Sequence, residues 1–76
     1  MTIKDLRHEL IINFLGKEFN KEKIEKHLKN LNVECVIIKS NCIPEYDYIL
    51  YSNLDKNILI KTSVEFHCIE DLWIEE

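Results

Sequence analysis

Glycine and proline are nearly absent from this sequence, which has one of each among its 76 residues. This composition excludes collagen-like and Pro/Gly-rich low-complexity chains, so we expect order along nearly the whole chain. Cysteine occurs three times, as Cys35, Cys42 and Cys68. Small secreted domains usually carry a dense, even set of cysteines, so this odd number favours reduced thiols and a cytoplasmic location.

Long apolar runs and glycine-rich loops are also missing. No segment approaches the roughly 20 consecutive apolar residues that cross a bilayer, and the N-terminus does not resemble a secretory signal. The single glycine, Gly16, follows an expected helix and is not part of a phosphate-binding loop. We therefore expect neither a membrane segment nor a nucleotide cofactor.

Positive charge is scarce and unevenly placed. The formal net charge is -4, and residues 1–32 contain seven Lys/Arg against five Asp/Glu, whereas residues 33–76 contain three against nine. Nucleic-acid binding needs a basic stripe that neutralises phosphates, so direct binding of nucleic acid is not expected. The acidic half either serves solubility alone or suits a larger protein with a basic surface.

The length of the chain predicts one domain, residues 1–76, with one modest core. Domains of this size bury only about 60% of the surface that their unfolded chains expose, so the large apolar side chains are needed for stability. A deep catalytic cleft is therefore not expected. We predict a protein that acts by binding and not as an enzyme.

A first helix is expected at the N-terminus. Thr2 stands three residues before Asp5, a spacing close to that of a capping box, and Gly16 stands where a helix would end. Most apolar residues between them share one helical stripe, which favours a helix over residues 2–15. The apolar run at residues 10–12 is also compatible with the start of a strand.

A second helix is expected from the N-cap Asn20 to about Leu31. Phe19 and Ile24 flank its start with the spacing of a hydrophobic staple. Its apolar face is narrow, and its charged residues form i,i+4 pairs typical of a solvated surface. This helix is therefore predicted on the outside of the domain.

Strands are expected in the C-terminal half. Beta-branched and aromatic residues concentrate in Val33–Ile38 and in Tyr46–Tyr51, with Pro44 between them. From Ile58 to Cys68 apolar and polar residues alternate, which predicts one long half-buried strand, although a bend near Thr62 and Ser63 is also compatible with the pattern. The tail, residues 69–76, is ambiguous between a short helix and an extended segment.

This order predicts an α+β domain in which two N-terminal helices pack on one face of a three-stranded antiparallel β-meander. From Lys21 to Trp73 the order of elements loosely resembles that of a BRCT domain. The chain departs from the motifs of that family, because residues 30–32 replace its glycine pair and residues 14–16 lack the Ser/Thr-Gly of its phosphate pocket. It also lacks the second long helix, so membership is not inferred.

The cysteines and histidines do not have the spacing of a metal site. Zinc sites commonly use close pairs such as C-x2-C, and none occurs here. The neighbours His67 and Cys68 would point to opposite faces of a strand. We therefore predict no metal, buried or half-buried thiols, and solvated positions for His8 and His27.

Tyrosine and tryptophan gather among acidic residues in the C-terminal half. These side chains are common anchors of protein interfaces, because each presents a large rigid surface with one polar group. In so short a chain they are also core material, and both interpretations stay open. The predicted partner-binding residues are Tyr46, Asp47, Tyr48, Glu65, Glu70, Asp71 and Trp73.

Two functional hypotheses follow from the small size, the polarised charge and the lack of catalytic motifs. The first is a small acidic module that inhibits or regulates a larger protein. Mobile elements encode such inhibitors against host defence nucleases, as anti-CRISPR proteins do, and bacteria encode others that neutralise toxins. The alternative is a homo-oligomeric structural or accessory module, such as a homodimer, in which the Ile58–Cys68 strand or a neighbouring strand pairs edge to edge.

Overall fold

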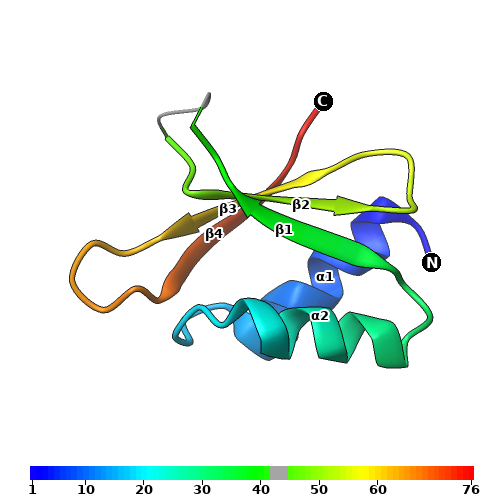
Figure 1. The fold of residues 1–76 in the computed structure, drawn as a ribbon, viewed down its shortest axis with the longest axis horizontal. Helices are drawn as coiled ribbons and strands as arrows, with labels where there is room; N and C mark the ends of the chain where they lie inside the picture. Colours follow the sequence, from blue (N-terminus) through cyan, green and yellow to red (C-terminus); the bar gives the residue numbers. More distant parts are fainter. Residues whose placement is uncertain (42–44) are drawn as a thin grey trace.

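A computed structural model describes residues 1–41 and 45–76, so the predicted thiol Cys42 and the strand-breaking Pro44 lie outside the described residues. Its elements are α1 (Ile3–Phe14), α2 (Lys21–Asn30), β1 (Cys35–Lys39), β2 (Tyr48–Ser52), β3 (Ile58–Thr62) and β4 (Ile69–Ile74). The strands form one antiparallel sheet in the order β1-β2-β3-β4 (Figure 1). The α+β class, the two helices and the antiparallel sheet are confirmed. The prediction of three strands is wrong, because the described residues form four.

Helix α1 begins at the predicted capping box. The side-chain hydroxyl of Thr2 accepts a hydrogen bond from the backbone N–H of Asp5, and the Asp5 carboxylate accepts one from the backbone N–H of Thr2. Gly16 follows the helix with a φ of 82°, a left-handed conformation that glycine adopts without strain. Residues 3–14 are therefore helical, and the alternative of a strand at residues 10–12 is wrong.

Helix α2 begins at Asn20, as predicted. The Asn20 side chain accepts a hydrogen bond from the backbone N–H of Lys23, and the C-cap residue is Leu31. Ile24 and Leu28 form the buried stripe of this helix. In the described part of the chain, neither helix is long and apolar enough to span a membrane.

The long strand predicted from Ile58 to Cys68 is wrong, because the chain reverses in the middle of this segment. Strand β3 ends at Thr62, and the backbone N–H of Ser63 donates to the carbonyl oxygen of Cys68. His67, at the end of the turn, has a φ of 53° and donates its N–H to the carbonyl of Ser63. The two halves of the predicted strand are thus opposite arms of a hairpin.

Apolar residues continue to alternate through the turn, but their side chains are not buried there. Val64 and Phe66 occupy the turn and are 101% and 72% exposed. The ambiguous tail forms β4, which pairs antiparallel with β3. Within β4, Leu72 is buried whereas Trp73 is 54% exposed, so neighbouring residues point to opposite sides of the sheet.

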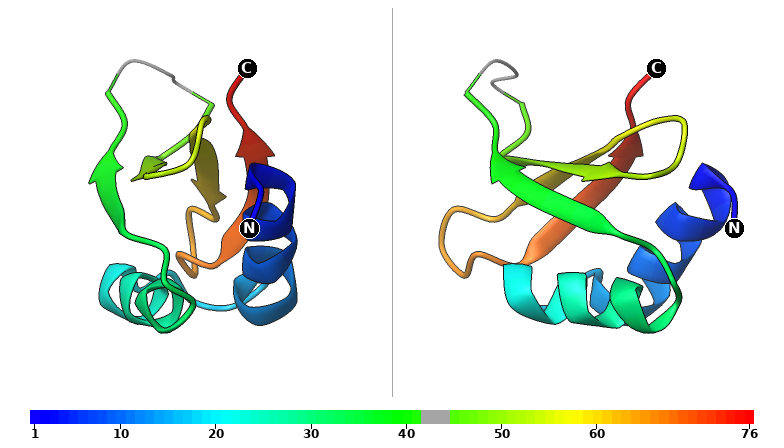
Figure 2. Two further views of the ribbon diagram at one scale, coloured as in Figure 1. Left: turned by 90° about the vertical axis from the view of Figure 1, so that its right-hand side faces the viewer. Right: turned by 45° about the vertical axis from the view of Figure 1, so that its right-hand side comes forward.

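Both helices lie on the same side of the sheet (Figures 1 and 2). Helix α1 contacts β4, and α2 contacts β1. We call the helix-covered side the inner face and the other side the outer face. The hydrophobic core lies between the helices and the inner face, and its buried residues are Ile3, Leu6, Leu10, Ile24, Leu28, Val33, Ile37, Leu50, Ile58, Ile60, Ile69 and Leu72.

Candidate functional site

The outer face of the sheet carries a row of apolar side chains that crosses all four strands. Ile38 on β1 pairs with Ile49 on β2, and Ile49 pairs with Leu59 on β3. Leu59 in turn pairs with Trp73 on β4. We call these four residues the outer row. Directly opposite positions in antiparallel strands lie close enough for their side chains to contact, so the row forms one continuous apolar strip.

The ends of the outer row are exposed and its middle is covered. Ile49 and Leu59 are 9% and 6% exposed, whereas Ile38 and Trp73, on the two edge strands, are 45% and 54% exposed. A second cross-strand pair beside the row, Val36 and Tyr51, is also exposed. The outer face therefore presents large apolar side chains from both edges of the sheet.

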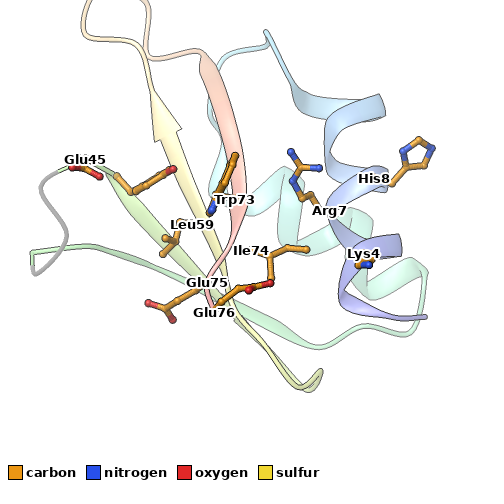
Figure 3. A pocket seen from close by; sticks show the side chains of 10 residues that line it. Lys4, Arg7, His8, Glu45, Leu59, Trp73, Ile74, Glu75 and Glu76 are labelled. Atoms are coloured by element: carbon orange, nitrogen blue, oxygen red, sulfur yellow. The ribbon is translucent and has the colours of Figure 1, made fainter.

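An open groove borders the outer row at its β4 end (Figure 3). Leu59 and Trp73 lie side by side on neighbouring strands and form part of the groove wall. The other lining residues come from α1, from the segment before β2, from the end of β4 and from the residues after it, and they are Lys4, Arg7, His8, Glu45, Tyr46, Ile74, Glu75 and Glu76. The groove thus joins an aromatic anchor to several charged side chains.

Acidic residues surround the outer row. Burial raises the pKa of the Tyr46 hydroxyl, and the negative charges of Asp71 and Glu45 raise it further. Antiparallel pairing extends one residue beyond the strands, because the N–H of Asn53 donates to the carbonyl of Glu34 and the N–H of Glu75 donates to that of Asn57. Since side chains alternate along a strand, Glu34, Asp71 and Glu75 lie on the outer face.

Among the described strand residues, Lys61 carries positive charge on the outer face, and it pairs with Asp71 across β3 and β4. Lys4 and Arg7 of α1 add two positive charges at the groove. Against these three cations stand the acids Glu34, Glu45, Asp71, Glu75 and Glu76. The rim of the apolar row is net acidic.

The structure brings three of the predicted partner-binding residues into one region. Tyr46 and Trp73 line the same groove, and Asp71 acts electrostatically on Tyr46. Asp71 and Trp73 are two positions apart on β4 and share the outer face. Their role in binding remains a prediction, and their shared location makes it testable.

Two other predicted residues have contacts within the fold. Asp47 accepts hydrogen bonds from the backbone N–H and the hydroxyl of Thr62, at 2.8 and 3.0 Å. Tyr48 lies on the inner face, where its ring stacks on Phe19 with centroids 4.0 Å apart and its hydroxyl contacts His67 at 3.1 Å. Both side chains therefore hold neighbouring segments together.

The remaining two predicted residues lie away from the groove. Glu65 is exposed in the turn between β3 and β4. Glu70 is exposed on β4. The register shifts at this point, because Lys61 pairs with Asp71 whereas the next residue of β3, Thr62, pairs with Ile69, so Glu70 has no paired residue opposite it on β3. The structure does not bring them to the outer row.

The thiols and imidazoles of the described residues are dispersed. Burial raises the pKa of the Cys35 thiol to about 11, with a further contribution from Glu25, so this thiol is poorly nucleophilic. Cys35 and Cys68 are half-buried free thiols, as predicted. Among residues 1–41 and 45–76, no group of three or more His, Cys, Asp or Glu side chains is arranged to hold a metal ion.

The sequence reasoning missed Val36, Ile38, Ile49 and Leu59, which it treated only as strand residues. A usable signal was present, because β1, β2 and β3 each contain three consecutive apolar residues in place of strict alternation. Consecutive apolar residues are typical of strands that are covered on both faces. Here only one face is covered by helices.

No protein-family model matches the chain. No curated protein and no solved structure shows significant similarity to it either. The functional interpretation therefore depends on the residues and the geometry described above.

Proposed function

We propose that this chain is a protein-binding module that inhibits or regulates a larger protein, and that it binds through the outer face of its sheet. The observation that carries the proposal is the outer row, in which Ile38, Ile49, Leu59 and Trp73 cross the sheet with no helix over them. The ends of the row, Ile38 and Trp73, are exposed, whereas Ile49 and Leu59 lie covered between them. Exposed apolar side chains with a polar rim are typical of interaction sites.

Trp73 is the proposed anchor of the interface. Tryptophan is among the residues that contribute most to binding in protein interfaces, because burial of its large rigid side chain costs little conformational entropy. Its half-exposed ring stands beside the groove, where a partner side chain can cover it. Tyr46 adds a second aromatic wall.

The acidic rim selects a partner with a basic surface. Complementary charge speeds association and disfavours partners that carry the same sign. Proteins that bind nucleic acid carry basic surfaces for phosphates, so an acidic module that covers such a surface competes with the nucleic acid. This supports an inhibitor of a nucleic-acid-binding protein, such as a host defence nuclease or a toxin that acts on nucleic acid.

The experiment compares three baits in quantitative affinity capture from a bacterial lysate: the wild-type chain, Trp73→Ala and Phe66→Ala. Phe66 is the matched control, since it is an exposed aromatic residue in the β3–β4 turn, away from the outer row. A basic protein retained by the wild type and by Phe66→Ala, and depleted by Trp73→Ala, supports the proposal. Loss of one anchor is expected to weaken binding of that purified protein by about 30-fold or more.

Equal retention by all three baits contradicts the proposed site. Retention of DNA or of anionic vesicles, with no protein dependent on Trp73, contradicts the proposed class of partner. A partner bound through the acidic rim also dissociates faster as salt is raised, whereas binding governed by the apolar row alone is less affected by salt.

A further inference from the structure

The two edges of the sheet are protected differently. Along β4, the segment after α1 covers the strand backbone: the N–H of Gly16 donates to the carbonyl of Ile69, and the N–H of Ile69 donates to that of Lys17. Further along the same edge, Nε of Arg7 donates to the carbonyl of Leu72 at 2.6 Å. Most of this edge is therefore unavailable to another strand.

Strand β1 forms the other edge and has no such cover among the described residues. The backbone N–H of Ser40 donates to the carbonyl of Asp47, and that of Asn53 donates to the carbonyl of Glu34. These two bonds show which residues of β1 point their backbone groups toward β2. Since bonded and non-bonded pairs alternate along an antiparallel ladder, the N–H and C=O groups of Cys35, Ile37 and Lys39 point away from β2. They form an open strand edge.

We propose that β1 pairs antiparallel with β1 of a second copy of this chain, about a two-fold axis at Ile37. In this register Ile37 faces Ile37 of the second copy, and Cys35 faces Lys39. Every outward N–H and C=O of these three residues then meets a partner. The alternate positions, Val36 and Ile38, face each other on the outer face as a non-bonded pair, in which side chains approach most closely.

The strand is complementary to itself, and this favours a second copy over an unrelated strand. Val36 and Ile38 are 54% and 45% exposed in one copy, and each would cover the other across the axis. Glu25 and Cys35 line the same groove, so Glu25 lies near the position where Lys39 of the second copy would stand. Opposite charges thus meet at both ends of the paired strands.

Lys26 and Lys29 line the same groove as Cys35, so the charge contribution is small and mainly sets the register. The paired strands are short, and the interface is smaller than that of most permanent dimers. A dimer that forms in the micromolar to millimolar range is therefore expected. The inference shares Ile38 with the proposed binding face, but its test reads the backbone edge of β1 and does not involve the acidic rim or Trp73.

Amide hydrogen exchange of the wild-type chain, measured by NMR at micromolar and at millimolar protein, tests the proposal directly. The amides of Cys35, Ile37 and Lys39 are expected to gain at least about tenfold in protection as the concentration rises. Those of Val36 and Ile38 bond to β2 in one copy and serve as internal controls. Sedimentation equilibrium on the same samples is expected to show a monomer–dimer equilibrium.

Substitutions at Lys39 test the register. Lys39→Pro removes an outward N–H without removing a bond to β2, and it is expected to weaken the dimer at least about tenfold, whereas Lys39→Ala retains the N–H and has a smaller effect. Reversing the charge of Lys39 gives a second test, which stands even if the proline variant does not fold. Lys39→Glu weakens the dimer, and adding Glu25→Lys restores it.

A monomer at all concentrations, or an unchanged exchange pattern in β1, overturns the proposal. A dimer that is insensitive to every Lys39 variant also overturns it. A monomer that still binds a basic protein through Trp73 would refute this dimer and leave the proposed function in place.

Discussion

Leu59 and Trp73 face each other across β3 and β4, yet Leu59 is 6% exposed and Trp73 is 54% exposed. Leu59 lies on an interior strand and is covered by neighbours on both sides, whereas Trp73 lies on an edge strand beside an open groove. Two adjacent residues of one row therefore have separable roles, since Leu59 supports the sheet and Trp73 is available to a partner.

Truncation of these two residues is expected to give different losses of stability. Leu59→Ala removes a covered side chain and should lower the free energy of unfolding by about 2–4 kcal/mol. Trp73→Ala removes a side chain that is half in solvent and should cost about 1 kcal/mol. Urea denaturation checks the difference. Equal losses would identify Trp73 as core and would remove the basis of the binding surface.

Asp47 is expected to matter for stability. Its carboxylate accepts two hydrogen bonds from Thr62, whose side chain is buried, and so joins the start of β2 to the end of β3. Asp47→Ala should lower the free energy of unfolding by about 1–3 kcal/mol, because a backbone donor and a hydroxyl lose their acceptor. Asp55→Ala, at an exposed position in the turn between β2 and β3, is the control and should have little effect.

The capping box of α1 predicts an acid-dependent contribution to stability. Hydrogen bonds from the backbone and side chain of Thr2 lower the pKa of Asp5 below its ordinary value. A lowered folded-state pKa means that the stabilisation is complete above the unfolded pKa and is lost as pH falls through the folded pKa.

Thermal unfolding of the wild type and of Asp5→Asn should therefore differ near neutral pH, and the difference should shrink as pH falls through the lowered pKa of Asp5. Glu22→Gln, at an exposed position in the first turn of α2, controls for the general loss of one negative charge near a helix start. A difference that stays constant down to low pH would contradict the role of the ionised Asp5.

Cys35 is expected to resist alkylation in the folded chain. Burial raises its pKa from 9.0 to about 11, which lowers the thiolate fraction near neutral pH by about 100-fold. Mass spectrometry after brief iodoacetamide treatment at pH 8 should show slow modification of Cys35. The same treatment in denaturant should restore ordinary reactivity. Rapid labelling of the folded chain would show that the thiol is accessible and ionised.

The helices were predictable from local sequence. The caps at Thr2 and Asn20 and the terminating Gly16 act within a few residues of where they stand, so the sequence alone locates both helices. The reversal at residues 63–67 was not predictable in the same way. Its alternation matches that of a strand, and only the hydrogen bonds of Ser63 and the left-handed His67 reveal a turn.

The candidate site was predictable only in part. Tyr46, Asp71 and Trp73 stood out as aromatic and acidic residues, and they lie in one region. The outer row depends on the register of four strands, which brings together residues up to 35 positions apart, such as Ile38 and Trp73. Composition cannot reveal that arrangement, because it follows from the pairing.

A methyl and indole NMR titration of the chain with a partner protein identified by the bait comparison tests the outer-face interface. The resonances of Ile38, Ile49, Leu59 and Trp73 are expected to shift or broaden together, while those of two exposed residues elsewhere, Ile12 on α1 and Val64 in the β3–β4 turn, remain unchanged. Perturbations confined to Ile12, Val64 or the helices, with the outer row unaffected, would contradict that interface.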